Sequence, residues 1–120
     1  MKRKHHDLLV WQEAMALVKE VYEASECFPK DELYALTSQM RRAAVSIPSN
    51  IAEGAARTGV KEFLQLLSIA RGSLSELETQ IIIAQDLGYI KETSTLLERI
   101  DKTFAMIGGL INSLRKRNIK

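Results

Sequence analysis

Clusters of cationic side chains are the feature of this sequence best suited to chemistry. Guanidinium and ammonium groups bind phosphate oxygens through charge-assisted hydrogen bonds, so such clusters favour the binding of a polyanion, with an affinity that falls steeply as salt rises. The candidate residues are one pair, one run of three and three single cations: Arg41 and Arg42; Arg115, Lys116 and Arg117; and Arg57, Lys61 and Arg71. The sequence therefore indicates contact with nucleic acid, although basic tails that only solvate a protein have the same composition.

Three of these cations stand apart from the rest. Arg41-Arg42 and Arg71 interrupt small or apolar surroundings within expected helices. A guanidinium group in such surroundings either pairs with a carboxylate across an interface or points to a ligand. The spacing leaves both roles open.

Side chains for nucleophilic or metal chemistry are sparse. The only histidines, His5 and His6, are expected in a basic N-terminal tail, where they offer no base to a serine nucleophile. A di-iron bundle needs Glu-x-x-His on two helices, which the sequence lacks, and its single cysteine, Cys27, is expected as an apolar filler at one end of the fold. The carboxylates that could be paired are expected on solvated or ion-paired helix surface: Glu53, Glu62, Glu76 and Glu78. We expect no catalytic residue, no metal and no cofactor, and a protein that is not an enzyme.

The elements that position these side chains are helices. Apolar residues recur at spacings of three and four, which places them on one face of an α-helix, and no stretch alternates with the period of two that a half-buried strand shows. The four stripes are Val10, Ala14, Leu17 and Val21; Leu33, Leu36, Met40, Ala43 and Ile47; Phe63, Leu67, Ala70, Leu74, Leu77, Ile81 and Ala84; and Leu97, Ile100, Phe104, Ile107, Ile111 and Leu114. The sequence predicts an all-α protein.

Proline, glycine and capping residues divide the chain into four helices, near residues 8–27, 30–55, 59–87 and 92–117. Pro29 ends the first helix or starts the second, Thr58 caps the third, Gly88 stops it, and Thr93 or Ser94 opens the fourth. Pro48 lies inside the second helix, where we expect a kink and a nearby side chain, Ser46, Ser49 or Asn50, on the carbonyl that the proline leaves free.

Short connections between such helices favour an antiparallel up-down-up-down four-helix bundle. We expect one domain over residues 1–120, with basic tails at 1–7 and 118–120. In that topology both tails and the connection between the second and third helices share one end. The net charge of the whole chain is only +2, but the cations are unevenly distributed. That end collects the cations of the tails together with Arg57 and Lys61, while residues 8–114 as a whole carry a net −4.

Two helices carry more apolar surface than a bundle core needs. The first has a second row, Trp11, Met15, Val18 and Tyr22, and the third adds Leu64, Leu66, Ile69, Ile82 and Ile83. Apolar faces of this width are typical of subunit contacts, so we expect a homo-oligomer. No apolar run is long enough to cross a membrane, and a single cysteine fits a reducing cytoplasm.

The central segment resembles a known family. Asp7-Leu8-Leu9-Val10-Trp11-Gln12-Glu13-Ala14 and the run from Leu36 to Gly54, which contains Arg41-Arg42-Ala43-Ala44-Val45-Ser46-Ile47-Pro48-Ser49-Asn50, are similar to the bacterial four-helix bundle family encoded in intervening sequences of 23S ribosomal RNA genes. Lys61-Glu62-Phe63-Leu64, the stretch Ser73–Gln80 and Gly88-Tyr89 continue the match over about residues 7–115. The positions that match the family's basic motif are Arg41 and Arg42.

The resemblance implies a cytoplasmic bacterial protein that assembles as a homopentamer. The family is similar to the accessory protein of diversity-generating retroelements, a basic pentameric barrel that works with a reverse transcriptase and its RNA. We therefore expect an oligomeric ring that binds RNA or DNA through basic surface. The alternative is a ring that recruits a partner protein, with nucleic acid incidental.

Overall fold

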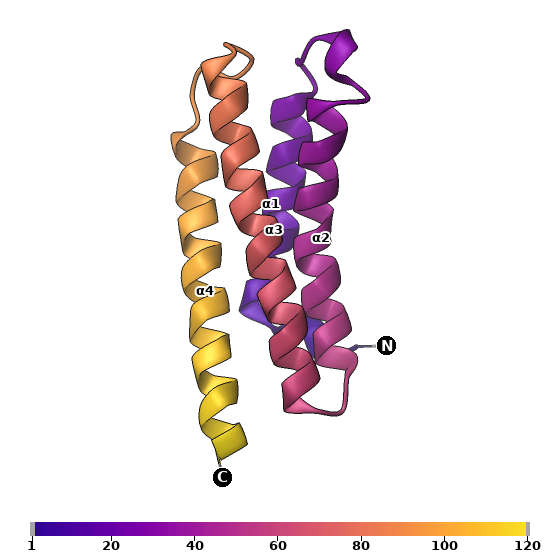
Figure 1. Cartoon of the computed structure of the whole chain (residues 1–120), viewed down its shortest axis with the longest axis vertical. Helices are drawn as coiled ribbons and strands as arrows, with labels where there is room; N and C mark the ends of the chain where they lie inside the picture. The colour runs from indigo at the N-terminus through magenta and orange to yellow at the C-terminus, as the bar shows by residue number, and fades with distance from the viewer. Residues whose placement is uncertain (1, 120) are drawn as a thin grey trace.

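The computed structural model describes residues 2–119, with side chains described through Arg117. Within that part of the chain lie four α-helices, two short 3-10 helices and no strand: η1 (Lys4–Asp7), α1 (Leu9–Ser25), η2 (Lys30–Glu32), α2 (Leu36–Ala56), α3 (Val60–Asp86) and α4 (Ser94–Ile119). The α-helices lie side by side in an elongated bundle of 51 × 26 × 20 Å (Figure 1). The prediction of an all-α protein with four helices is confirmed.

Each helix packs against two neighbours: α2 against α1 and α3, and α4 against α3 and α1. Figure 1 shows the α1–α2 and α3–α4 connections at one end of the bundle, drawn at the top. Both chain ends and the α2–α3 connection lie at the other end, drawn at the bottom. The cations of these three segments therefore share one end, which we call the basic end.

The core forms where the four apolar stripes meet. Leu17, Ile47, Leu74 and Ile107 are completely buried, one from each helix. Nearly all stripe positions are buried as expected, and Leu36, Phe63, Leu97 and Phe104 are partly buried. Leu33 is the exception, because it precedes α2 and is 47% exposed.

The second helix begins six residues later than the sequence predicted. Residues 30–32 form η2, and the backbone N–H of Leu36 then donates to Oε1 of Glu32 at 3.4 Å at the start of α2. The expectation of a helix over 30–55 was wrong at its start, because the backbone of Ala35, with φ −125° and ψ −106°, leaves the helical region between η2 and α2. The third helix matches 59–87 within one residue, but its cap residue is Gly59 in place of Thr58.

The chain ends differ from the expected tails. Residues 4–7 form η1, which packs against α1 and α2. At the other end, α4 continues through residues 118 and 119, whereas Lys120, expected in the C-terminal basic tail, lies outside the described residues. Cys27 is exposed, so the prediction that it fills the end of the bundle was wrong.

Helix α2 continues through Pro48, which is buried. A proline at this position removes the helical donor to the carbonyl of Ala44. The Asn50 side chain, expected to serve a freed carbonyl, donates instead to the carbonyl of Ser46 at 2.8 Å and to its Oγ at 2.9 Å. Further along, Gly54 allows close approach of α3, since a Cβ atom there would lie 2.7 Å from Cδ1 of Phe63. Gly88 has a φ of +81°, which suits its predicted role at the end of α3.

Candidate nucleic-acid interface

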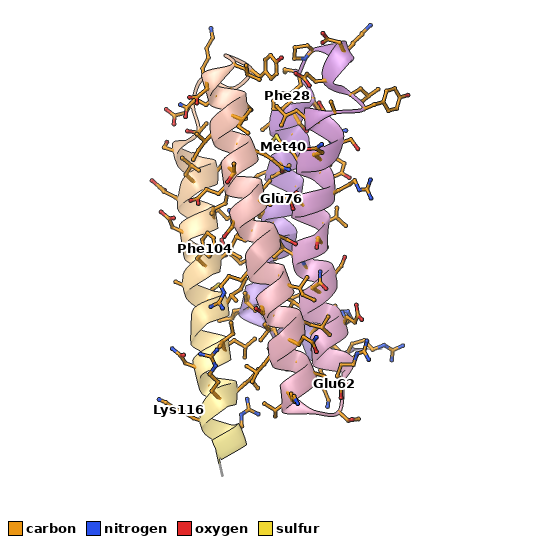
Figure 2. All side chains as sticks on the ribbon, viewed as in Figure 1. Phe28, Met40, Glu62, Glu76, Phe104 and Lys116 are labelled. Carbon is orange, nitrogen blue, oxygen red and sulfur yellow. The ribbon has the colours of Figure 1, made fainter. Side chains whose placement is uncertain are left out.

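The eight cations predicted to contact nucleic acid fall in separate places. Arg57 and Lys61 flank the α2–α3 connection, and Arg115, Lys116 and Arg117 lie in the last turns of α4, so these five share the basic end. Figure 2 labels Lys116 and Glu62 at this end. Arg71 is exposed on α3. Arg41 and Arg42 lie in the first half of α2, and the sixteen residues from Arg41 to Arg57 correspond to about 24 Å of helix. The structure therefore does not bring all eight together.

Acidic side chains at the basic end are already paired with cations. Nη2 of Arg57 lies 2.7 Å from Oε2 of Glu53, and its Nη1 lies 3.6 Å from Oε2 of Glu62. Nζ of Lys2 lies 3.1 Å from Oδ1 of Asp7. Among the described residues, Lys61 and the run 115–117 are exposed and form no ion pair with a carboxylate, so this end carries unpaired positive charge.

The N-terminal segment was expected at this end as a basic tail, but its packing against the bundle was not expected. The backbone N–H of Arg3 donates to Nδ1 of His6 at 2.9 Å, and Nε2 of Gln12 donates to the carbonyl of His6 at 2.8 Å. The ring centroids of His5 and His6 lie 5.0 Å and 5.4 Å from that of Trp11. The two histidines were expected in a solvated tail, but they pack against α1. A useful signal was the proximity in sequence of an aromatic residue, Trp11, six residues after His5 and five after His6.

This segment also encloses a hollow against α2. Arg3, Lys4 and His5 form one wall, Ala52, Ala55 and Ala56 form the other, and the volume is about 330 Å³. Two basic side chains and a histidine therefore line a concave surface whose opposite wall carries only methyl groups. The residues that line this hollow include no carboxylate, and its cations suit a negatively charged group.

Arg41 forms contacts within the chain. Its Nε donates to Oγ of Ser25 at 2.9 Å, its Nη2 donates to the carbonyl of Tyr22 at 3.4 Å, and its Cζ lies 4.6 Å from the centroid of the Tyr22 ring. These contacts fix α2 to the end of α1. Two roles were expected for this arginine, an ion pair across an interface or contact with a ligand. Its observed contacts show a third role, in which Arg41 connects two helices of the same bundle.

A wide groove of about 630 Å³ lies beside Arg41 and Arg42, between the end of α1 and the start of α2. It is lined by apolar and aromatic side chains as well, among them Tyr22, Leu33 and Tyr34, and Tyr34 is 92% exposed. The Thr37 hydroxyl, which also lines the groove, is buried and has no hydrogen-bond partner among the described residues. Acidic residues surround this end of the bundle, including Asp31 and Glu32, so the groove is poorly placed for a polyanion.

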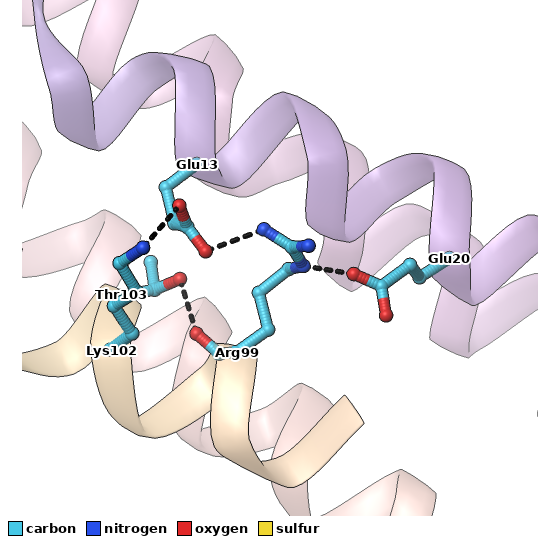
Figure 3. Close-up of polar contacts among 5 residues, drawn as sticks. All are labelled: Glu13, Glu20, Arg99, Lys102 and Thr103. Atoms are coloured by element: carbon cyan, nitrogen blue, oxygen red, sulfur yellow. Dashed lines mark hydrogen bonds and ion pairs between the residues drawn. The ribbon is translucent and has the colours of Figure 1, made fainter. Parts of the chain in front are cut away.

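A second charged region lies between α1 and α4, where Arg99 reaches two glutamates of α1 (Figure 3). Nη1 of Arg99 donates to Oε2 of Glu13 at 2.6 Å, and Nε donates to Oε1 of Glu20. Burial favours a lower pKa for Arg99, but the hydrogen bond and charge of Glu20, with those of Glu13, raise its pKa overall. The group stays charged and ion-paired, and it serves the packing of α4 on α1.

The extra apolar faces predicted from the sequence have different surroundings. On α3, Ile69, Ile82 and Ile83 are 48%, 44% and 42% exposed. On α1, Trp11 and Val18 are partly buried, while Met15 and Tyr22 are exposed along the boundary with α2. The α3 isoleucines are thus the clearer candidates for a subunit contact.

No three histidine, cysteine, aspartate or glutamate side chains in the described part of the chain are grouped so that they could hold a metal ion. None of the described helices combines the length and the apolar character needed to span a bilayer.

The fold and its charge distribution define a class of protein: a four-helix bundle with one cationic end and exposed apolar surface on α3. Residues 6–109 match the family described as 23S rRNA-intervening sequence protein, and the chain belongs to that family. A search of curated proteins found no match.

Proposed function

We propose that this chain is a non-enzymatic, cytoplasmic homo-oligomer that binds nucleic acid, RNA in particular, through its basic end. The observation that carries the proposal is the gathering of cations from the N-terminus, the α2–α3 connection and the end of α4 at one end of the bundle. Phosphates are attracted to such a surface irrespective of base sequence. The family name, which refers to ribosomal RNA, is compatible with this function.

The oligomer we propose is a ring of five antiparallel up-down-up-down bundles. The pentamer comes from the family resemblance, and the exposed isoleucines of α3 supply apolar surface for contacts between neighbours. A ring repeats one weak cationic surface five times, which raises avidity without any change in one protomer. Arg57, Lys61 and the run 115–117 supply this surface, and Arg71 adds to it only if the ring brings α3 close to the ligand.

A filter-binding titration on structured RNA at several salt concentrations tests the nucleic-acid function. We expect binding tighter than micromolar at low salt, and an affinity that falls steeply as salt rises. A triple change of Arg115, Lys116 and Arg117 to glutamine should weaken binding and flatten the salt dependence. Micromolar or weaker affinity with a flat salt dependence would contradict the proposal.

The second candidate function is a scaffold that recruits a partner protein. The groove beside Arg41 favours it, because tyrosine and arginine in an apolar hollow are typical of the residues that carry binding energy in protein interfaces. A partner that stays bound in a pull-down after nuclease treatment would support this function.

An Arg41→Glu, Arg42→Glu double variant separates the roles of these two arginines. If light scattering shows that the assembly dissociates, the arginines serve subunit contacts. If the assembly persists and only RNA binding falls, they contact the nucleic acid. Their position, about 24 Å from Arg57 along α2 and beside acidic residues, leads us to expect little loss of RNA binding in the intact assembly.

A further inference from the structure

Two hollows on the surface of the bundle meet at the same pair of residues. The basic hollow, defined above by Arg3, Lys4 and His5 against α2, shares His5 and Ala52 with a second hollow between α1 and α2. The second hollow, which we call the aromatic hollow, has a volume of about 340 Å³ and is lined by Trp11, Met15, Val45 and Pro48 among others. The cationic and aromatic hollows are therefore neighbours, with His5 and Ala52 at their boundary.

The aromatic hollow has the composition of a site for a flat ring. Its walls are a tryptophan, aliphatic side chains and a buried proline, and its polar lining side chains are His5 and Ser49. The volume lies at the lower end of the range for small-molecule sites, about 300–1,000 Å³. The His5 ring stands at 63° to the indole of Trp11, with 5.0 Å between centroids, so it forms a corner beside the indole.

The basic hollow has the composition of a phosphate site. Arg3 and Lys4 are exposed cations, and the facing α2 residues are alanines, which bring neither charge nor bulk. The hollow lies at the basic end, where the potential attracts a polyanion.

We propose that the two hollows together hold one nucleotide of a single-stranded nucleic acid, with its phosphate at Arg3 and Lys4 and its base against Trp11. The proposal rests on the proposed function and names the site at which an unpaired nucleotide is held. Single-strand recognition combines a cationic track with aromatic side chains on which bases stack, and a base inside a duplex cannot leave the stack to reach such a side chain. Ser49 supplies a hydroxyl that can donate to or accept from a base edge.

Trp11 is the only tryptophan in the chain, so its fluorescence reports on this site alone. The experiment titrates the full-length protein with a single-stranded oligouridylate and with duplex RNA of equal length, and it follows Trp11 emission and the anisotropy of end-labelled RNA together. We expect both RNAs to bind, because both carry phosphates, but only the single strand to quench Trp11.

Two variants locate the base. Ala52→Leu fills the junction of the hollows while keeping the tryptophan and a good helix former, and Trp11→Ala removes the stacking surface. Each should weaken binding of the oligouridylate by about 5- to 150-fold, the range that corresponds to loss of one stacked base. The matched control for the first is Ala105→Leu at an exposed position of α4, and for the second Tyr34→Ala, each expected to leave binding unchanged.

One double variant locates the phosphate. Arg3→Ala, Lys4→Ala should reduce the slope of log affinity against log salt by about 1.4 for a single strand, as expected for two lost phosphate contacts. Lys91→Ala, in the connection at the opposite end of the bundle, is the matched control and should leave the slope unchanged.

The outcomes separate this site from the function on which it rests. If labelled RNA binds but Trp11 emission stays constant and Ala52→Leu binds like the parent, this site is wrong and the proposed function stands. If neither RNA binds, the proposed function fails as well. If Trp11 emission changes with protein concentration in the absence of RNA, and Ala52→Leu alters the mass in solution, a second copy covers the aromatic hollow and the proposal is overturned.

Discussion

Arg99 on α4 donates from Nη1 to Oε2 of Glu13 on α1 across 2.6 Å, and the side chain of Glu13 is only 11% exposed (Figure 3). The same guanidinium donates to Glu20, which lies about two turns further along the same face of α1. Nζ of Lys102 lies 3.5 Å from the other oxygen of Glu13. Helix α4 is thus attached to α1 by charges as well as by apolar contacts.

Arg99→Met should destabilise the protein by about 2 kcal/mol, because it leaves two partly buried carboxylates without their main partner. This value lies between the near-zero cost typical of exposed pairs and the cost of about 3–5 kcal/mol when a buried pair is broken. Urea denaturation measures the change. Lys102→Met is the matched control, since the Lys102 side chain is 62% exposed and its loss should cost less than about 0.5 kcal/mol. Equal effects of the two changes would contradict this account of the α1–α4 contact.

Leu74→Ala and Ile107→Ala should each cost about 2–5 kcal/mol, because both side chains are completely buried and their truncation leaves a cavity. Leu9→Ala provides the comparison, since Leu9 is 68% exposed and its truncation should change stability by less than about 0.5 kcal/mol. Denaturant midpoints are the measurement, and a small effect at Leu74 or Ile107 would place that residue outside the core.

These buried residues show how far the sequence alone could go. Leu74 and Ile107 were identified by spacing, because residues three and four apart on a helix share a face that needs burial. Leu33 continued such a stripe and is nevertheless exposed, since the non-helical backbone of Ala35 separates η2 from α2 and leaves Leu33 ahead of the helix. Such a break depends on the fold of the preceding turn, which periodicity does not describe.

The candidate site was predicted less completely than the fold. Arg57, Lys61 and the run 115–117 lie at the shared end because topology alone places them there. Arg41 is engaged by Ser25 and Tyr22, sixteen and nineteen residues away, and such contacts require knowledge of how α1 and α2 face each other. His5 was assigned to a tail because a short polar segment at a terminus has no helical pattern of its own.

Gly54→Ala should destabilise the protein by about 1–3 kcal/mol, because the added methyl group would lie 2.7 Å from the Phe63 ring and 3.3 Å from Cβ of Leu66. Gly108→Ala makes the same change within α4, where nothing lies within 4 Å of the added atom, and should stabilise the protein by about 0.5–1 kcal/mol. Thermal melts of both variants distinguish the effects of crowding and helix propensity. A stabilising Gly54→Ala would show that Phe63 moves aside without cost.

Ile69→Glu, Ile83→Glu on α3 should convert the proposed oligomer to single chains, because two charges would replace apolar surface at the contact between protomers. Light scattering gives the mass, and circular dichroism should show unchanged helix content, since both side chains are more than two-fifths exposed. Ser68→Glu, Ser75→Glu places the same two charges at exposed positions of the same helix and should leave the mass unchanged. A parent protein that is already monomeric would remove the ring from the proposed function.

Acid should weaken the protein partly through Glu92. Its carboxylate accepts hydrogen bonds from the Ser94 side chain and from the Ser94 backbone N–H, the latter at 2.6 Å, and these lower the pKa of Glu92 below the ordinary value of 4.5. The folded protein therefore binds this proton less tightly than the unfolded chain does. The stabilisation is present above about pH 4.5 and is lost as pH falls through the lower folded-state pKa.

Urea midpoints of the parent and of Glu92→Gln, measured from about pH 7 to about pH 3, test this prediction. The parent should lose more stability than the variant over the acid range, because the variant has no carboxylate to titrate at this position. Parallel curves for the parent and Glu92→Gln would show that the Ser94 contacts contribute nothing.

The different chemistry of the two sides of α1 also decides the handedness of the bundle. Four helices with similar apolar stripes can be arranged clockwise or anticlockwise around a common core, and the buried stripes alone distinguish the two mirror-related orders poorly. The reversed order would place Glu13 and Glu20 beside α2 and turn Arg99 toward α3, so the guanidinium would be separated from both of its carboxylates. Partly buried charges without their partners are costly, so the polar side of α1 selects one winding of the chain.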